Sequence, residues 1–443
     1  MTAAERPSDA APRKRRWHQF SLRTLLLLTA VLGLCLGVSV RLWRRHQAVD
    51  AIRAMPGADV AYDYQYEAER DRFDGSAVPP GPKWLRKLVG DSLFDDMFCN
   101  VVGAYVGAYN IKLTMPLPPK DQLTSIDDED LRRMKEIVPR HPGLLWLGIT
   151  VSSRVTDAGL AHLEGVTQLR DLDLAESQVT DAGLVHVRHA TGLEHLDLRG
   201  TKVGKGCVAR LAPFSKLRRL SLGGTGVDDS GLKDLNDFAS LRELYLFDTK
   251  ITDTGLNYLH GLPNLEGLSL YGTAITDAGL PHLRGMKALR GLNLSLTKVT
   301  DAGLVHLQEL PALEFLSLAG TPVLGRGLGQ LRELARLDYL VLWETPLTDR
   351  GLAELTGHRG LTTLDLRKTS ITDAGVVHLK ELPSLRCVRL DDTRITDVGL
   401  RDIGQVAGLR QLTLKGTGVT DAGVEELKQA LPDLSIEVAR KAN

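Results

Sequence analysis

A segment of six residues recurs along this chain at intervals of 24 residues. It reads Val-Thr-Asp-Ala-Gly-Leu at 155–160, 179–184 and 299–304, and begins Ile-Thr-Asp-Ala-Gly at 275–279 and 371–375. In each unit a pattern of Leu-x-x-Leu-x-Leu follows, for example at Leu265, Leu268 and Leu270. Eleven such units fill residues 155–418. Repetition at this interval predicts a stack of similar units, each contacting only its neighbours, instead of one compact core.

The leucine pattern predicts an α/β leucine-rich repeat solenoid, a horseshoe with a parallel sheet on its concave side and helices on its convex side. Side chains alternate across a strand, so the last two leucines of each unit are expected to point into the core. Phe214 and Phe238 occupy otherwise apolar positions and are also expected there. The aspartate of each Thr-Asp-Ala-Gly segment, such as Asp157 or Asp277, is an expected helix N-cap. A threonine closes almost every strand, as at Thr297, and is expected to bond backbone through its hydroxyl.

The two ends of the array depart from the regular unit. Residues 46–125 do not repeat, and we interpret them as an N-terminal cap that covers the apolar end of the first stacked unit. The repeats extend over 126–418, and 419–443 are expected to form a C-terminal cap. The units that begin at Val203 and Val323 lack the Thr-Asp pair. Their convex side is therefore expected to be the least regular.

The N-terminal region combines a basic tail with an apolar segment. Residues 1–46 contain nine Lys or Arg and two acidic residues, so the remainder of this neutral chain is acidic. Thr24 to Val40 carry no charge, and a helix of this length spans about 25 Å, close to a bilayer core of ~30 Å. We predict a cytoplasmic tail at 1–23 and one transmembrane helix at 24–43, with the protein in the inner (cytoplasmic) membrane and its repeats outside the cytoplasm. A cleaved signal peptide is the alternative.

The Thr-Asp-Ala-Gly-Leu units resemble those of bacterial leucine-rich repeat proteins, and they are similar to the repeats of F-box-type leucine-rich repeat proteins. The resemblance covers about 126–438. A basic tail and a single-helix anchor ahead of the repeats also occur in this bacterial group, so the resemblance implies a membrane-anchored member. It is specific for the fold and not for the ligand, because this scaffold serves many ligands. The sequence of 46–125 shows no F-box-like helical segment, which argues against a ubiquitin-ligase adapter.

Motifs for catalysis and cofactor binding are weak in this sequence. The segment from Gly200 to Gly206 resembles a phosphate-binding loop, but it has three residues between the glycines instead of four and lacks the final Ser or Thr. Five histidines share one register on the convex side, where exposed positions explain them without a metal: His162, His186, His282, His306 and His378. We therefore predict no enzyme, no cofactor, no metal site and no nucleotide. The acidic balance of the repeats argues against a nucleic-acid ligand.

Specificity is expected on the concave face, at the three outward positions of each unit that alternate with the inward leucines. Chance would place about one of the nine aromatic residues of the array at these positions, yet six occupy them, within five consecutive repeats. Small or polar residues lie between two aromatic groups. Strand preference explains part of this pattern, so aromatics that merely pack are the alternative. The predicted ligand-binding residues are Tyr245, Phe247, Tyr271, Asn293, Phe315, Tyr339 and Trp343.

These features favour a membrane-anchored protein that mediates protein–protein interaction through its concave face, with a protein or peptide as the ligand. The first alternative is a structural or scaffold protein of the cell envelope, whose solenoid spaces or assembles its partners. The second is an enzyme activity within residues 46–125, although this region lacks a recognisable catalytic constellation.

Overall fold

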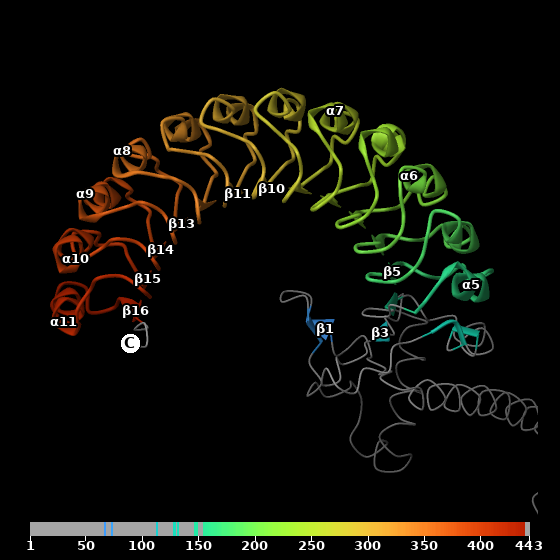
Figure 1. Ribbon diagram of the computed structural model, residues 1–443, viewed down its shortest axis with the longest axis horizontal. Helices are drawn as coiled ribbons and strands as arrows, with labels where there is room; N and C mark the ends of the chain where they lie inside the picture. The colour runs from blue at the N-terminus through green and yellow to red at the C-terminus, as the bar shows by residue number, and fades with distance from the viewer. Residues whose placement is uncertain are drawn as a thin grey trace, which may run out of the picture.

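The computed structural model describes residues 154–438 continuously, together with the short segments 66–67, 72–73, 112–113, 127–129, 131–132 and 146–148. The described chain forms a curved solenoid, with strands along the inside of the arc and helical turns along the outside (Figure 1). The predicted tail and transmembrane segment lie outside the described residues, as does most of the predicted N-terminal cap. Among the helices of the described part, none is both long and apolar enough to cross a membrane.

One sheet of 14 strands lines the concave side, with β3 to β16 in sequence order. Neighbouring strands are parallel, and equivalent residues of successive units pair, as Gly291 of β10 does with Gly267 of β9 and Phe315 of β11. A constant repeat length produces this register, because equivalent residues of successive units then lie side by side along the sheet. The strands of the sheet are β3 (Lys112–Leu113), β4 (Trp146–Gly148), β5 (Asp171–Asp173), β6 (His195–Asp197), β7 (Arg219–Ser221), β8 (Glu243–Tyr245), β9 (Gly267–Ser269), β10 (Gly291–Asn293), β11 (Phe315–Ser317), β12 (Tyr339–Val341), β13 (Thr363–Asp365), β14 (Cys387–Arg389), β15 (Gln411–Thr413) and β16 (Ser435–Glu437).

The core lies between this sheet and the convex turns, and it runs the length of the arc. The strand leucines point into it as predicted: Leu268 is 3% exposed and Leu270 is fully buried. Phe214 and Phe238 are buried as well, which confirms their expected place in the core. The parallel concave sheet and the leucine-rich core of the prediction are therefore confirmed.

The convex elements are shorter than ordinary helices, and many are 3₁₀ turns. A unit of 24 residues must also hold a strand and two connections, which leaves room for only one to three helical turns; 3₁₀ geometry serves well in pieces of that length. The α-helices are α5 (Asp157–Leu160), α6 (Cys207–Arg210), α7 (Asp253–Leu256), α8 (Asp349–Ala353), α9 (Asp373–Val376), α10 (Asp397–Ile403) and α11 (Asp421–Ala430). The 3₁₀ helices are η3 (Ala161–Leu163), η4 (Gly183–Val187), η5 (Asp229–Asp237), η6 (Asn257–Leu259), η7 (Leu280–Leu283), η8 (Leu304–Glu309), η9 (Leu328–Glu333) and η10 (Val377–Glu381).

The aspartates of the convex turns have a different role from the predicted one. The N-cap is the threonine before them, as at Thr156, whose hydroxyl accepts a hydrogen bond from the backbone N–H of Ala158. The aspartate instead reaches the next unit: the Asp277 carboxylate accepts from the backbone N–H of Thr300 at 2.8 Å and from its hydroxyl at 2.6 Å. The prediction of aspartate caps is wrong because this side chain points along the solenoid and not back into its own turn. The same two bonds join Asp128 to Thr156, Asp157 to Thr180, Asp229 to Thr252, Asp253 to Thr276, Asp349 to Thr372, Asp373 to Thr396 and Asp397 to Thr420.

In most Thr-Asp-x-Gly segments the glycine makes room for the aspartate of the preceding unit. A Cβ added to Gly303 would lie 2.3 Å from Oδ1 of Asp277 and 2.9 Å from a methyl of Leu280. Threonine, aspartate and glycine therefore act together across the boundary between two units. We call this arrangement the convex interlock.

Two units lack the interlock residues, as the sequence predicts. In one of them, Asp181 accepts hydrogen bonds from the backbone N–H groups of Gly204 at 2.8 Å and Gly206 at 3.1 Å, in place of a threonine. In the other, Leu324 stands at the threonine position and is 44% exposed. Because the carboxylate of Asp181 occupies two amides of the segment that resembles a phosphate loop, that segment is part of the packing between units.

The threonines that close the strands form the expected ladder. Thr297 donates its hydroxyl to the carbonyl oxygen of Leu294 at 2.6 Å, within its own turn. The same bond forms in ten units, so these threonines are structural: Thr201, Thr225, Thr249, Thr273, Thr297, Thr321, Thr345, Thr369, Thr393 and Thr417.

Candidate functional site

The concave surface is made by residues that flank the inward leucine of each strand. In β9 the outward residues are Gly267 and Ser269, and Tyr271 follows at the next outward position. Successive strands carry different residues at these positions, so each unit contributes its own chemistry to a common surface. The seven predicted ligand-binding residues all lie on this surface and are half-buried: Tyr245, Phe247, Tyr271, Asn293, Phe315, Tyr339 and Trp343.

Two of these aromatics, Tyr245 and Phe247, contact residues of the N-terminal half of the arc. The ring of Phe247 lies over Gly223 of the preceding unit, where an added Cβ would meet ring carbons at 2.2–2.4 Å. Tyr245 donates its hydroxyl to Glu243 at 2.7 Å, and Arg219 donates to the same carboxylate from Nε at 2.7 Å. Burial and the neighbouring Glu243 carboxylate raise the pKa of Tyr245 to about 12. Tyr245 is therefore held as a neutral hydrogen-bond donor at neutral pH.

Tyr245 and Phe247 help to line a hollow of about 460 Å³. Burial alone would raise the pKa of Glu243 beside it, but hydrogen bonds from Arg219 and Tyr245 lower that pKa, so the carboxylate stays ionised. His195 Nδ1 lies 3.0 Å from both carboxylate oxygens of Asp171. The hollow is lined by Asp171, Leu172, Asp173, His195, Leu196, Asp197, Arg199, Arg219, Ser221, Tyr245 and Phe247.

Three aromatics gather over the C-terminal half of the arc. Phe315 and Tyr339 pack edge to face, with ring centroids 5.3 Å apart. The ring of Trp343 lies near two cations, the Arg367 guanidinium at 5.6 Å from the ring centroid and the Lys368 ammonium at 5.4 Å. These contacts fix the rings in place, which limits the entropy lost if a partner packs against them.

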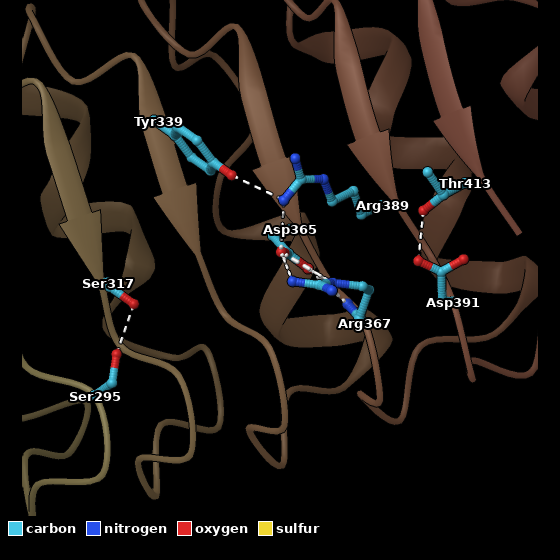
Figure 2. Close-up of polar contacts among 8 residues, drawn as sticks. All are labelled: Ser295, Ser317, Tyr339, Asp365, Arg367, Arg389, Asp391 and Thr413. Carbon is cyan, nitrogen blue, oxygen red and sulfur yellow. Dashed lines mark hydrogen bonds and ion pairs between the residues drawn. The ribbon is translucent and has the colours of Figure 1, made fainter. Parts of the chain in front are cut away.

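The surface between the two aromatic groups has small side chains. The hydroxyls of Ser295 and Ser317 are 2.6 Å apart and buried (Figure 2). Asn293 accepts the backbone N–H of Ser295 through Oδ1 at 3.0 Å, so its side chain also shapes the turn after β10. Tyr271 lies at the border of this floor on β9. With strands stacked at ~4.8 Å, the two steps from β9 to β11 correspond to roughly 10 Å.

The sequence-based prediction considered aromatics and missed the charged residues at the same outward positions. Asp171 and Arg219 line the N-terminal hollow, whereas Asp365 and Arg389 lie beside Tyr339 at the other end. The register that identified the aromatics also identifies these residues. Their pairing could not be derived, because a charged side chain reaches neighbours two units away, as Arg389 does to Tyr339.

Within the continuous stretch 154–438 and the short described segments, there is no group of three or more His, Cys, Asp or Glu arranged to hold a metal ion. The convex histidines lie at partly exposed positions; His306, for example, lies 3.3 Å from a guanidinium nitrogen of Arg284. Cys207 is buried and its pKa is raised by desolvation, so this thiol is held protonated and packs as an apolar side chain.

Comparisons with known proteins agree with this architecture. Residues 239–259 and 359–380 match the family described as Leucine Rich repeat. No curated protein matches the chain. An internalin of Listeria monocytogenes shares the fold, with a TM-score of 0.53 and 19% identity over 71% of this chain and 94% of that one.

Two further solved structures are more distant. One is the mouse RP105/MD-1 complex, with a TM-score of 0.49 and 20% identity over 68% of this chain and 51% of that one. The other is a leucine-rich repeat protein of Leptospira interrogans, with a TM-score of 0.45 and 14% identity over 72% of this chain and 93% of that one. The repeat pattern, the stacked parallel sheet and the likeness to the internalin agree, and the chain therefore carries leucine-rich repeats folded as a solenoid.

Proposed function

We propose that the protein binds a protein or peptide partner through the concave face of its repeats, with the aromatic residues of β8 to β12 as anchors. One observation carries the proposal. The convex side repeats the same interlock residues, whereas the concave positions differ from unit to unit and hold six half-buried aromatics. Solenoids of this kind use their extended concave surface for binding, and exposed aromatics at interfaces often supply most of the binding energy.

The shape of the surface favours a slender ligand. The floor of β9 to β11 offers glycine, serine and asparagine, whose small side chains permit a close approach of backbone. A width of roughly 10 Å suits an extended peptide or one edge of a helix. Hydrogen-bonded polar groups such as Ser295 and Ser317 are already satisfied, so an apolar ligand group can cover them at little cost.

Affinity capture with the full-length chain tests this proposal. The double variant Tyr271→Ala with Trp343→Ala should weaken a discrete partner by ~2 kcal/mol or more, because two interface anchors are lost. The control is Leu324→Ala, which removes an exposed apolar side chain from the convex side and should leave capture unchanged. A double variant that binds normally but unfolds at a lower temperature would show that the aromatics are packing elements.

The same experiment separates the two alternatives. A solenoid that captures only copies of itself, independently of the aromatics, would support a structural role in the cell envelope. We assign no catalytic role to the repeats, since leucine-rich repeat proteins are usually binding proteins. An activity within 46–125 would be independent of substitutions on the concave face.

We also propose that residues 24–43 anchor the protein in the inner membrane, with the repeats outside the cytoplasm. The uncharged segment and the excess of basic residues before it support this orientation. Alkaline carbonate should leave the full-length chain in the membrane pellet. Protease should reach the repeats once an outer barrier is opened, and digestion only after lysis of the inner membrane would contradict the orientation.

A further inference from the structure

A buried carboxylate stands on the concave face of β13. The Asp365 side chain is 1% exposed, although it occupies an outward position. An ionised carboxylate with so little water needs partners. Arg367 supplies them from Nε at 2.8 Å and Nη2 at 2.6 Å, and Arg389 of the next strand adds Nη1 at 3.5 Å.

The side chains of the two arginines are held in place and are partly exposed. Arg367 is 36% exposed and Arg389 is 37% exposed, so both reach solvent above Asp365. Arg389 also donates to the hydroxyl of Tyr339 at 3.0 Å, which fixes it from a second side (Figure 2). The hydrogen bond to Asp365 raises the pKa of Arg367 and keeps it charged. A guanidinium has five N–H donors, and those turned away from Asp365 match the two oxygens of a carboxylate.

Cations slightly outnumber carboxylates on the strands around this pair. Ahead of earlier strands, an arginine of one unit pairs with a glutamate of the next, as Arg170 does with Glu194 at 2.9 Å and Arg290 with Glu314 at 3.6 Å. Two exposed arginines follow one another ahead of β7 and β8, and again ahead of β14 and β15: Arg218 and Arg242, then Arg386 and Arg410. In the four units of β12 to β15, the residue before each strand, the outward positions and the following turn carry six cations against five carboxylates: Arg367, Lys368, Arg386, Arg389, Arg410 and Lys415 against Asp338, Glu344, Asp365, Asp391 and Asp392. Lys415 also pairs with Glu437 of β16 at 2.6 Å.

The equivalent positions of β5 to β8 have the opposite balance. They carry five cations against seven carboxylates: Arg170, Arg199, Arg218, Arg219 and Arg242 against Asp171, Asp173, Glu176, Glu194, Asp197, Glu243 and Asp248. By this count the concave face carries a net charge of −2 over β5 to β8 and of +1 over β12 to β15. Of these two regions, only β12 to β15 has a net positive charge by this count.

We propose that the C-terminal half of the concave face, β12 to β15, binds an acidic segment of a polypeptide, with one carboxylate of the segment on Arg367 and Arg389. This rests on the proposed function and adds the chemistry of the partner. Trp343 and Tyr339 provide an aromatic border for the residue next to that carboxylate. Asp391 lies on the adjacent strand, but its oxygens already accept from the Thr413 hydroxyl at 2.6 Å and the backbone N–H of Lys415 at 2.7 Å. Its charge is thereby partly compensated.

The test measures fluorescence anisotropy of a labelled peptide with the full-length chain. Three strand steps span about 14 Å, so a probe of about eight residues that alternates glutamate and serine covers the surface. We expect it to bind at least about tenfold more tightly than the same peptide with glutamine, and to weaken between about 50 mM and about 300 mM salt. Arg367→Gln with Arg389→Gln should weaken binding about tenfold.

Two further variants control for fold and for general charge. Arg367→Lys with Arg389→Lys keeps the charge but loses the forked donors, and should fall between the intact chain and the glutamine variant. Arg219→Gln removes a carboxylate-paired arginine from the N-terminal half and should change binding less than about twofold. Equal losses in the Arg219 variant and the double glutamine variant would overturn the proposal, as would equal affinity for the glutamate and glutamine peptides.

Two other outcomes have a definite meaning. If an oligothymidine of similar length binds as tightly as the acidic peptide, the site is a general polyanion surface and the assignment to polypeptide is wrong. If a captured partner depends on Tyr271 but not on Arg367 and Arg389, the proposed function stands and this inference fails.

Discussion

The convex and concave sides of this solenoid share one 24-residue period but use it differently. On the convex side, Asp277 and Thr300 form the same bonds as seven other pairs, and the departures lie at and beside the units that begin at Val203 and Val323. On the concave side, the strands hold the same backbone register, yet their outward residues range from Gly291 to Phe315 and Asp365. Repetition of a residue therefore marks a contact between units, whereas variation in a fixed register marks a surface that the fold does not need.

The largest effect is the difference in unfolding free energy between a glycine-to-alanine substitution on the convex side and one on the concave side. Gly303→Ala places a Cβ 2.3 Å from Asp277 Oδ1 and should cost about 3 kcal/mol, because the carboxylate must leave two hydrogen-bond partners. Gly291→Ala on the concave side meets nothing within 4 Å and should cost less than about 0.5 kcal/mol. Urea unfolding of the two variants measures the difference. Equal losses would show that the two sides do not differ in this way.

An intermediate effect is expected at Asp365, a buried charge on the concave face. Asp365→Ala leaves Arg367 and Arg389 without their shared carboxylate and should cost about 2 kcal/mol, discounted because the arginines are one-third exposed. Tyr271→Ala should cost less than about 1 kcal/mol, since its ring is only half-buried. Chemical unfolding of both variants, with circular dichroism to verify the fold, is the measurement. A larger cost at Tyr271 would identify that ring as a core element.

The regular part of the fold could be predicted from the sequence because the same pattern recurs in every unit. Only one assignment of inward and outward positions fits all of the units. Leu268 and Leu270 are buried as the alternation requires, and Thr297 bonds backbone as its position suggests. The aspartates were assigned to the wrong turn. A single unit read alone makes Asp277 look like a cap, and only the stacked neighbour reveals Thr300 as its partner.

The sequence predicts which face of the solenoid each site residue lies on. It does not predict which side chains contact one another. Register places Tyr245 and Trp343 on the concave face, and both are there. It does not say which way a ring turns. Phe247 leans over Gly223 toward the charged hollow, whereas Trp343 lies near the cations of the next unit. Rotamers depend on the neighbours of each side chain, and those neighbours belong to other units.

A smaller effect should appear as coupling within the convex interlock. Asp277→Ala removes the acceptor of two bonds to Thr300, and it also clears the space that a Cβ at Gly303 needs. Combining it with Gly303→Ala should therefore cost about 1 kcal/mol less than the sum of the single changes. A double-mutant cycle by urea unfolding measures this coupling. Strict additivity would show that the glycine and the aspartate act independently.

One unit of the convex side departs from the others at the residue that closes its turn. The residue that closes each convex turn is apolar in most units, such as Leu334 and Leu382, but it is His358 in one. His358 is 1% exposed, and its Nδ1 accepts the backbone N–H of Leu361 at 3.2 Å. Accepting this hydrogen bond requires the neutral ring. Burial lowers the pKa of His358 below its usual value, and the nearby Arg332 lowers it further.

The smallest predicted effect is a pH dependence that His358 adds to the stability of the repeats. A histidine with a lowered folded-state pKa takes up its proton more readily when unfolded, so its contribution is complete above the unfolded value of about 6.5 and is lost as pH falls below it. The urea midpoint should therefore fall between pH 7 and pH 5 by more in the intact chain than in His358→Leu. That variant restores the apolar residue of the neighbouring units and should be as stable as the intact chain at pH 7, or slightly more stable. An identical pH dependence in both proteins would contradict this prediction, because it would show that His358 binds its proton equally well in the folded and unfolded chain.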